Sequence, residues 1–175
     1  PMVVRDEDVR LAGIDRLQVA DIRYAAELGF TVKLLALAKL SDSGLELRVA
    51  PTLVKRGTPL AEVRGPYNAI RVVGDAVGDT LFYGRGAGML PTASAVVGDL
   101  IDVAVGRAAL TLDTLNLWSE SAASPRLTTA SEVRSRDYLR FTIADRPGVL
   151  AGTAYLLGEH AIGIAARIQD DPRAE

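Results

Sequence analysis

The sequence lacks several residues and patterns on which common classes of functional site depend. It has no cysteine, which excludes a disulfide framework, a thiolate nucleophile and a thiolate metal site. Its one histidine, His160, argues against a histidine-rich metal site and against a Ser-His-Asp triad, and we expect no metal site. The net charge is −2 and no basic tract is present, so neither nucleic acid nor an anionic membrane is an expected partner.

Long apolar runs and a leader pattern are also missing. No apolar run approaches the roughly twenty residues of a transmembrane helix, and the first residues do not follow the pattern of a signal peptide. We therefore expect a soluble, cytoplasmic protein. The 175 residues, of which 49% are apolar and 24% charged, predict one globular domain, or one domain with a small appendage.

The first half of the chain combines a helical pattern with several extended ones. Apolar residues at helical spacing before Gly29 predict a helix at about 18–28. The apolar run 30–40 and the segment 45–51 predict two strands that pair across the turn Ser-Asp-Ser-Gly. Residues 68–84 predict two further strands. Together these elements indicate a helix packed on an antiparallel sheet.

Three glycines at alternate positions, Gly84, Gly86 and Gly88, follow the last of these strands. Residues 92–105 then predict an amphipathic helix with Pro91 in its first turn. Glycine is used where the backbone needs a positive φ or approaches a ligand closely, and a helix start offers unpaired N–H groups to an anion. Taken alone, these residues favour a tight strand-to-helix turn over a cofactor cradle, because a single glycine-rich loop is a weak signal.

Four other side chains have a functional interpretation and a simpler one. Asp99 and Asp102 could act as an acid/base pair, but their spacing is typical of the solvated face of a helix. Arg85 suits a phosphate contact and an exposed turn equally. His160 lies near the end of a predicted helix, where a cation complements the helix dipole.

The last third of the chain predicts a linker and a small patterned unit. The Ser/Ala-rich residues 119–136 predict the linker. A strand at 138–144, a helix at 149–160 and a strand at 162–169 follow, which makes a β-α-β unit. About forty residues bury only a thin core, so this unit needs a partner surface or is incomplete.

The turn Asp-Arg-Pro-Gly joins the first of these strands to the helix. Asp145, Pro147 and Gly148 are suited to hold an amino-acid ligand, whose carboxylate would meet the helix N-terminus. An ordinary Asp N-cap with proline in the first turn accounts for the same residues. The residues alone leave the two interpretations about even.

Nearly the whole chain resembles a known family. The stretches VRLAGIDRLQVADIRYAAELGFTVKLLALAK and NAIRVVGDAVGDTLFYGRGAGMLPTASAVVGDLIDVA resemble the substrate-binding and dimerisation domain of bacterial homoserine dehydrogenase. The second is the more specific, because Phe-Tyr-Gly-Arg-Gly-Ala-Gly precedes Pro-Thr-Ala-Ser at a helix start. The stretch YLRFTIADRPGVLAGTAYLLGEHAIGIAARIQ resembles the opening half of an ACT domain, a small-molecule-sensing module. The resemblance runs from about Val4 to Gln169.

The resemblance implies an α+β fold, with a mostly antiparallel sheet and helices on one face, followed by a partial ferredoxin-like (ACT) β-α-β unit. It divides the chain into a substrate-binding and dimerisation domain at 1–118, incomplete at its N-terminus, a linker at 119–136 and a partial ACT domain at 137–175. It also implies a homodimer formed through the sheet.

The family reduces aspartate semialdehyde to L-homoserine with NAD(P)H, in threonine and methionine biosynthesis. The resemblance implies that the loop after the last strand lies against the nicotinamide end of the cofactor. The expected cofactor contacts are therefore Gly86, Ala87 and Gly88. Contacts to an amino-acid effector such as threonine are expected at Asp145, Pro147 and Gly148.

Parts of the family pattern are not found in the sequence. It has no Rossmann fingerprint G-x-G-x-x-G between a strand and a helix. The family's catalytic aspartate and lysine fall before Pro1, so no catalytic residue is assigned, and Ala12 replaces an acid found in relatives. We expect a non-catalytic C-terminal fragment that binds no cofactor alone and binds threonine weakly or not at all. The alternative is a free-standing amino-acid-sensing regulatory or dimerisation module.

Overall fold

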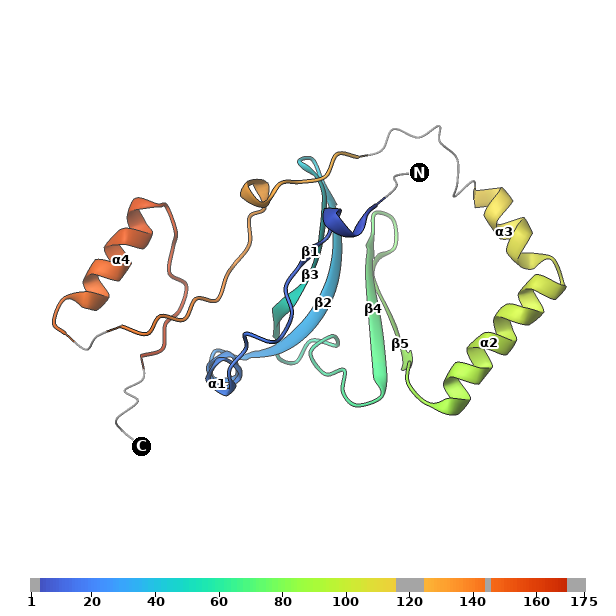
Figure 1. Ribbon diagram of the computed structural model, residues 1–175, viewed down its shortest axis with the longest axis horizontal. Helices are drawn as coiled ribbons and strands as arrows, with labels where there is room; N and C mark the ends of the chain where they lie inside the picture. Colours follow the sequence, from blue (N-terminus) through green and yellow to red (C-terminus); the bar gives the residue numbers. More distant parts are fainter. Residues whose placement is uncertain (1–3, 116–124, 144–145, 170–175) are drawn as a thin grey trace.

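The computed structural model describes residues 4–115, 125–143 and 146–169 (Figure 1). It contains two antiparallel strand pairs and four α-helices among these residues. This bears out the expected α+β fold with mostly antiparallel pairing. In chain order the elements are η1 (Asp6–Asp8), β1 (Arg10–Leu11), α1 (Val19–Glu27), β2 (Phe30–Ser41), β3 (Gly44–Lys55), β4 (Tyr67–Gly74), β5 (Gly78–Arg85), α2 (Met89–Ala104), α3 (Arg107–Leu115), η2 (Ala130–Glu132) and α4 (Val149–Glu159).

The long hairpin of β2 and β3 is the centre of the fold. The two strands pair antiparallel from Phe30 opposite Lys55 to Ser41 opposite Gly44, and a two-residue turn joins them. Strand β1 adds to the other edge of β3 in parallel, so the sheet order is β1-β3-β2. Strand β2 is one residue longer than the sequence pattern predicts, and β3 is longer at both ends because the ladder continues to Lys55.

One face of this hairpin is apolar along its length. Because opposite residues in an antiparallel pair share a face, the register places alternate residues of β2 and β3 side by side. Leu34 and Leu40 on this face are 53% and 69% exposed. Apart from Lys55, the face consists of Phe30, Val32, Leu34, Ala36, Ala38, Leu40, Leu45, Leu47, Val49, Pro51 and Leu53.

Helix α1 packs against β2, as expected. It ends at Glu27 with Leu28 as its C-cap, and Gly29 follows with φ 82°, a left-handed conformation that glycine adopts without strain. The carbonyl of Gly29 accepts a hydrogen bond from the N–H of Arg56 at 3.0 Å. The junction between α1 and β2 is thereby joined to the end of β3.

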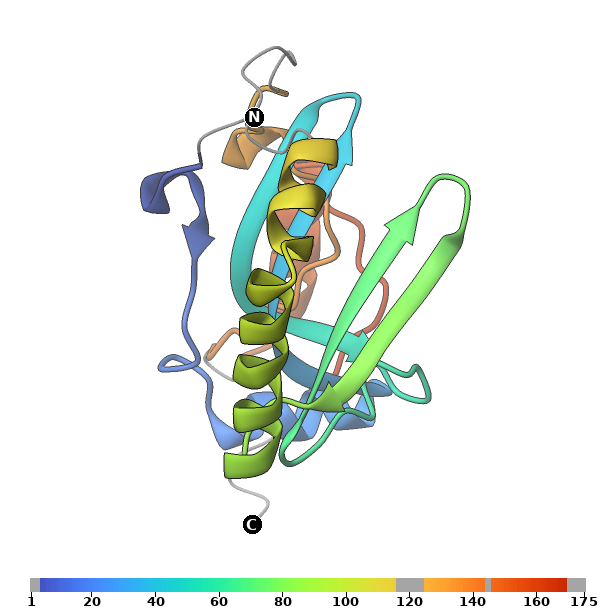
Figure 2. The same cartoon turned by 90° about the vertical axis from the view of Figure 1, so that its right-hand side faces the viewer.

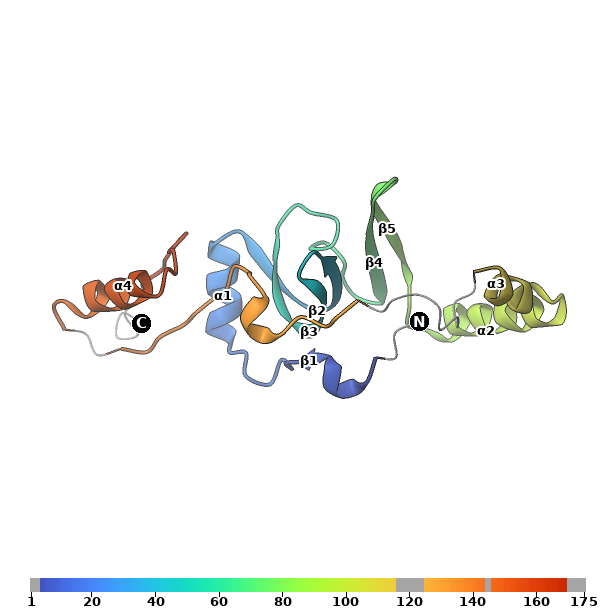
Figure 3. The same ribbon diagram turned by 90° about the horizontal axis from the view of Figure 1, so that it is seen from above.

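Strands β4 and β5 form a second hairpin on the other side of β2 and β3 from α1 (Figure 3). Tyr67 and Tyr83 stack with ring centroids 4.9 Å apart. Arg71 and Asp79 form a bidentate ion pair across the strands, with both N···O distances 2.8 Å.

Helix α3 follows α2 end to end across a bend, and both helices extend away from the sheets (Figure 1). Helix α2 begins at Met89, three residues before the predicted start, and α3 was not predicted from the sequence. The apolar arc of α2 is not buried, since Val96 and Leu100 are 53% and 63% exposed. The sequence predicts helices on one face of the sheet. Among the described helices, α1 packs there, whereas α2 extends away from the sheets.

The described part of the predicted linker contacts the sheet. Leu127 forms a parallel bridge with Leu45 at the start of β3. The N–H of Leu45 donates to the carbonyl of Arg126 at 2.8 Å, and the N–H of Thr128 donates to the carbonyl of Leu45 at 3.0 Å. We call residues 125–143 the connecting segment. The domain boundaries themselves stay a prediction.

Only the helix of the expected β-α-β unit forms among the described residues. Helix α4 is present, but neither 138–143 nor 162–169 forms a strand. A strand needs the backbone hydrogen bonds of a neighbour, and the two segments find no ladder partner in the described part of the chain. The prediction of strands at 138–144 and 162–169 is therefore wrong for this chain as described.

The chain exposes much more surface than a folded protein of its mass. Its accessible surface is 14206 Å², against about 8,200 Å² expected for a folded monomer of 18.6 kDa. The apolar residues that are buried in the described chain are Ala25 and Ala61. The exposed apolar faces of the hairpin and of α2 are surfaces that further protein could cover. Within the described ranges, no helix is both long and apolar enough to cross a bilayer.

We predict that Gly44→Ala destabilises the fold more than Gly57→Ala. Both glycines have a positive φ, 118° and 79°, so both substitutions strain the backbone. A Cβ at Gly44 would also overlap the carbonyl oxygen of Arg126, whereas a Cβ at Gly57 would meet no atom within 4 Å. The difference in the free energy of unfolding should be about 1–3 kcal/mol, measured by urea denaturation. Equal losses in the two variants would contradict the packing of the connecting segment on β3.

Candidate functional site

The glycine loop, residues 86–88, joins the end of β5 to the start of α2 (Figure 2). The N–H groups of Gly86 and Ala87 donate to the carbonyl of Pro66 at 3.1 and 3.5 Å. Gly88 is the N-cap of α2 and has no side chain with which to cap it. In the described chain, the N–H groups of Gly88, Met89 and the following residue have no acceptor. The helix start therefore presents a set of donors suited to an anion or a carbonyl oxygen.

Two of the three alternate glycines meet a structural requirement, and the two requirements differ. Gly88 has φ 124°, so the simple explanation of a turn that needs glycine holds at this position. Gly86 has an ordinary φ, but a Cβ there would overlap Nδ2 of Asn68. Gly84 also has an ordinary φ, and a Cβ there would meet nothing within 4 Å. Nothing in the described chain requires glycine at position 84.

Asn68 belongs to this site, although the sequence pattern did not single it out. It lies opposite Gly84 in the ladder between β4 and β5, and its side chain lies over Gly86. Its amide has no hydrogen-bond partner among the described residues. A primary amide offers both a donor and an acceptor. The available signal was the Asn-Ala pair at the start of the strand, which the family resemblance included without assigning it a role.

Two charged residues considered as functional candidates, one beside the loop and one at the far end of α2, are engaged with protein groups. The guanidinium of Arg85 lies 5.3 Å from the centroid of the Tyr67 ring, a cation–π contact that holds it on the hairpin. Asp102 accepts a hydrogen bond from Arg107 at 2.7 Å. This ion pair favours the solvated-face interpretation of Asp102 over an acid/base pair with Asp99.

The predicted effector residues are described in part. Asp145 lies outside the described residues. Gly148, with φ 86°, is the N-cap of α4, and Pro147 precedes the helix. The interpretation of an Asp N-cap with proline in the first turn is therefore wrong, because the helix begins later, at Val149. His160 lies at the end of α4, as expected, with Nδ1 2.9 Å from the carbonyl oxygen of Leu156.

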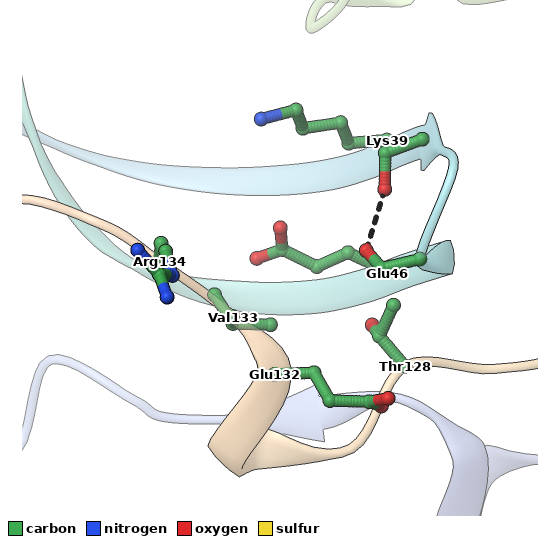
Figure 4. Close-up of a pocket in the computed structure, with 8 residues that line it drawn as sticks. Lys39, Glu46, Thr128, Glu132, Val133 and Arg134 are labelled. Carbon is green, nitrogen blue, oxygen red and sulfur yellow. Dashed lines mark hydrogen bonds between the residues drawn. The ribbon is translucent and has the colours of Figure 1, made fainter.

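A shallow cavity of about 330 Å³ lies away from the glycine loop, between the tip of β2 and β3 and the connecting segment (Figure 4). Its two carboxylates are already paired. Arg126 and Thr129 bind the carboxylate of Glu132 and lower its pKa to about 2. Glu46 lies 3.6 Å from Arg10 and 3.3 Å from Arg48. In the described part of the chain, no group of three or more acidic or histidine side chains could hold a metal ion.

The chain is similar to homoserine dehydrogenases of several bacteria. The enzyme from Neisseria gonorrhoeae is 44% identical over 165 residues, which cover 91% of this chain and 37% of the relative. The enzyme from Synechocystis is 40% identical over 184 residues, covering 95% of this chain and 40% of the relative. The chain therefore spans less than half the length of the relatives it matches.

Solved structures of homoserine dehydrogenases also match this chain over only part of their own length. A homoserine dehydrogenase from Thiobacillus denitrificans matches with a TM-score of 0.68 and 38% identity, over 94% of this chain and 38% of that one. The enzyme from Staphylococcus aureus matches with a TM-score of 0.53 and 45% identity, over 59% of this chain. The sequence model of the family Homoserine dehydrogenase matches residues 2–101, more than half of the chain. The chain belongs to the homoserine dehydrogenase family.

Proposed function

We propose that this chain is the substrate-binding and dimerisation part of a homoserine dehydrogenase, followed by part of an amino-acid-sensing module, and that it is not catalytic alone. The complete enzyme would interconvert aspartate semialdehyde and L-homoserine with NAD(P)H, in threonine and methionine biosynthesis. The observation that carries this proposal is the glycine loop, which leads into a helix start with unpaired N–H groups. It lies within the residues that the family model matches.

The loop residues fit a wall against which a nicotinamide cofactor could lie. Gly84 leaves open space at the end of β5, and Gly86 and Gly88 keep the backbone free of side chains that would hold a ligand away. When bound, the cofactor would supply the hydride chemistry. Gly86, Ala87 and Gly88 would position it by backbone contact, and the amide of Asn68 lies beside them.

The apolar face of β2 and β3 supports a homodimer through the sheet. Leu34 and Leu40 are largely exposed there, and a contiguous apolar face of this length is typical of an interface. A second copy presenting the same face would cover both by one symmetric contact. The large accessible surface of the isolated chain supports the same proposal.

The end of the chain supports a regulatory role. Pro147 and Gly148 lead into α4, whose start would receive the carboxylate of a small amino acid such as threonine. Asp145 would take the ligand's amino group. This residue arrangement is also what a free-standing sensor would use, and activity measurements separate the two functions.

We predict that the purified chain has no dehydrogenase activity. Oxidation of homoserine needs both a site for the hydride acceptor and a proton-transferring group, and a segment that is not catalytic alone would hold neither site complete. NADPH formation from homoserine and NADP⁺ should stay at the background rate, with a complete homoserine dehydrogenase as positive control. NADP⁺-dependent turnover by the chain alone would overturn the non-catalytic assignment.

We predict that Leu34→Glu weakens self-association of the chain. A carboxylate in the centre of an apolar interface loses its hydration without gaining a partner, so the dissociation constant should rise at least tenfold, about 1.4 kcal/mol. Val77→Glu is the matched control, because Val77 is 83% exposed in the turn between β4 and β5. Sedimentation equilibrium gives both constants. A monomeric parent chain at micromolar concentration, or equal effects of the two substitutions, would exclude a dimer through this face.

We predict that Gly86→Ala, placed in a complete dehydrogenase carrying this segment, weakens cofactor binding more than tenfold. The new methyl group would displace Asn68 and with it the glycine loop. Gly98→Ala is the control, since a Cβ there meets no atom within 4 Å. Fluorescence titration with NADPH measures affinity without turnover.

Adding Asn68→Ala to Gly86→Ala separates crowding from other causes. Removal of the Asn68 amide takes away the atoms that the introduced methyl group would overlap, so the double variant should recover affinity relative to Gly86→Ala. Unchanged affinity in Gly86→Ala would place the cofactor away from this loop.

A further inference from the structure

Asp21 is the buried charged residue of the described chain. It is 6% exposed and lies in the first turn of α1. Its two carboxylate oxygens have different partners. Oδ2 accepts a hydrogen bond from the N–H of Gln18 at 2.8 Å. Oδ1 accepts one from the hydroxyl of Tyr138 at 2.9 Å and one from Nε of Arg140 at 2.7 Å.

These contacts join parts of the chain that are far apart in sequence. Tyr138 and Arg140 follow Asp21 by 117 and 119 residues and belong to the connecting segment. Capping of α1 needs one oxygen of Asp21, and that oxygen is Oδ2. The other oxygen serves only to bind the connecting segment, so the residue has a function beyond capping its own helix.

The charge state of the group makes the contact strong. Burial alone would raise the pKa of Asp21, but the hydrogen bonds from Gln18, Tyr138 and Arg140 outweigh it, and the pKa lies below its usual value. Burial and the neighbouring carboxylate raise the pKa of Tyr138 to about 12. The carboxylate is therefore ionised and the phenol neutral around pH 7. An ionised carboxylate at this depth needs its donors, because unpaired buried charge is costly.

The elements on either side of Asp21 have different proposed functions. Helix α1 leads through Gly29 directly into β2, whose apolar face is the proposed dimer interface. Beyond Arg140 the chain continues towards α4, in the proposed regulatory module. Asp21 therefore lies at the contact between α1 and the connecting segment.

We propose that Asp21 is a coupling residue, through which the position of the connecting segment controls the first turn of α1. If the segment moves away, Oδ1 loses both donors at once. The carboxylate then either draws in water or shifts from its capping position, and the N-terminal turn of α1 loosens. That an amino-acid effector causes this movement rests on the proposed function. The coupling itself does not.

The coupling is tested on this chain by amide hydrogen exchange at residues 18–22. Arg140→Gln should speed exchange there at least tenfold, and Tyr138→Phe should have a smaller effect in the same direction. Arg134→Gln is the matched control. It removes an arginine from the same segment that has no partner among the described residues, so exchange in α1 should not change.

A double-mutant cycle distinguishes coupling through Asp21 from general loosening. In an Asp21→Asn background, Arg140→Gln should add no further increase in exchange. Should Asp21→Asn fail to fold, Tyr138→Phe combined with Arg140→Gln replaces it, and the two effects should be less than additive because they share Oδ1. Additive effects, or no response of α1 to Arg140→Gln, would overturn the proposal.

The regulatory consequence is tested in a complete dehydrogenase carrying this segment, with L-threonine as the probe. Tyr138→Phe and Arg140→Gln should keep the activity measured without threonine, whereas the threonine concentration for half-maximal response should shift at least tenfold. An unshifted response would show that the contact transmits nothing. If the parent enzyme does not respond to threonine, the proposed effector is wrong, and the exchange experiment still decides the coupling.

Discussion

The ladder between β2 and β3 is the constraint on which the rest of the molecule depends. Helix α1 is joined to β2 through Gly29, and β1 pairs with the edge of β3 that faces away from β2. The connecting segment forms a bridge to Leu45 at the start of β3. A shift of one residue in the pairing would move every apolar side chain to the opposite face. The register therefore determines where α1 packs, where the connecting segment contacts the sheet and which apolar face is exposed.

Local patterns predicted the elements well, and contacts between distant residues were not predictable from them. The helix before Gly29, the two hairpins, α2 and α4 follow from periodicity and turn residues over short stretches. The pairing of Leu45 with Leu127 has no local signal, and neither do the hydrogen bonds that join Asp21 to the connecting segment. The strands expected after residue 137 had the right composition, but composition does not supply a ladder partner.

In the candidate site, too, local patterns were predictable and contacts between distant residues were not. The family resemblance singled out the glycine loop, and glycine itself suggested a turn or a close approach. Only the structure assigns the reasons separately: backbone conformation at Gly88 and the side chain of Asn68 at Gly86. Asn68 was missed because a single polar residue in a strand has many explanations until its neighbour across the ladder is known.

The outer edge of β2 has a consequence for the fate of newly made chains. In the described residues no strand pairs with this edge, so a row of backbone donors and acceptors lies next to a long apolar face, an arrangement that invites amyloid-like stacking. Lys33 and Lys39 interrupt the opposite face of the strand, and the ammonium of Lys33 reaches across to the carbonyl of Val63. In-register stacking of identical copies would bring these like charges together at each step. Lysines on an edge strand are among the features by which proteins limit edge-to-edge pairing.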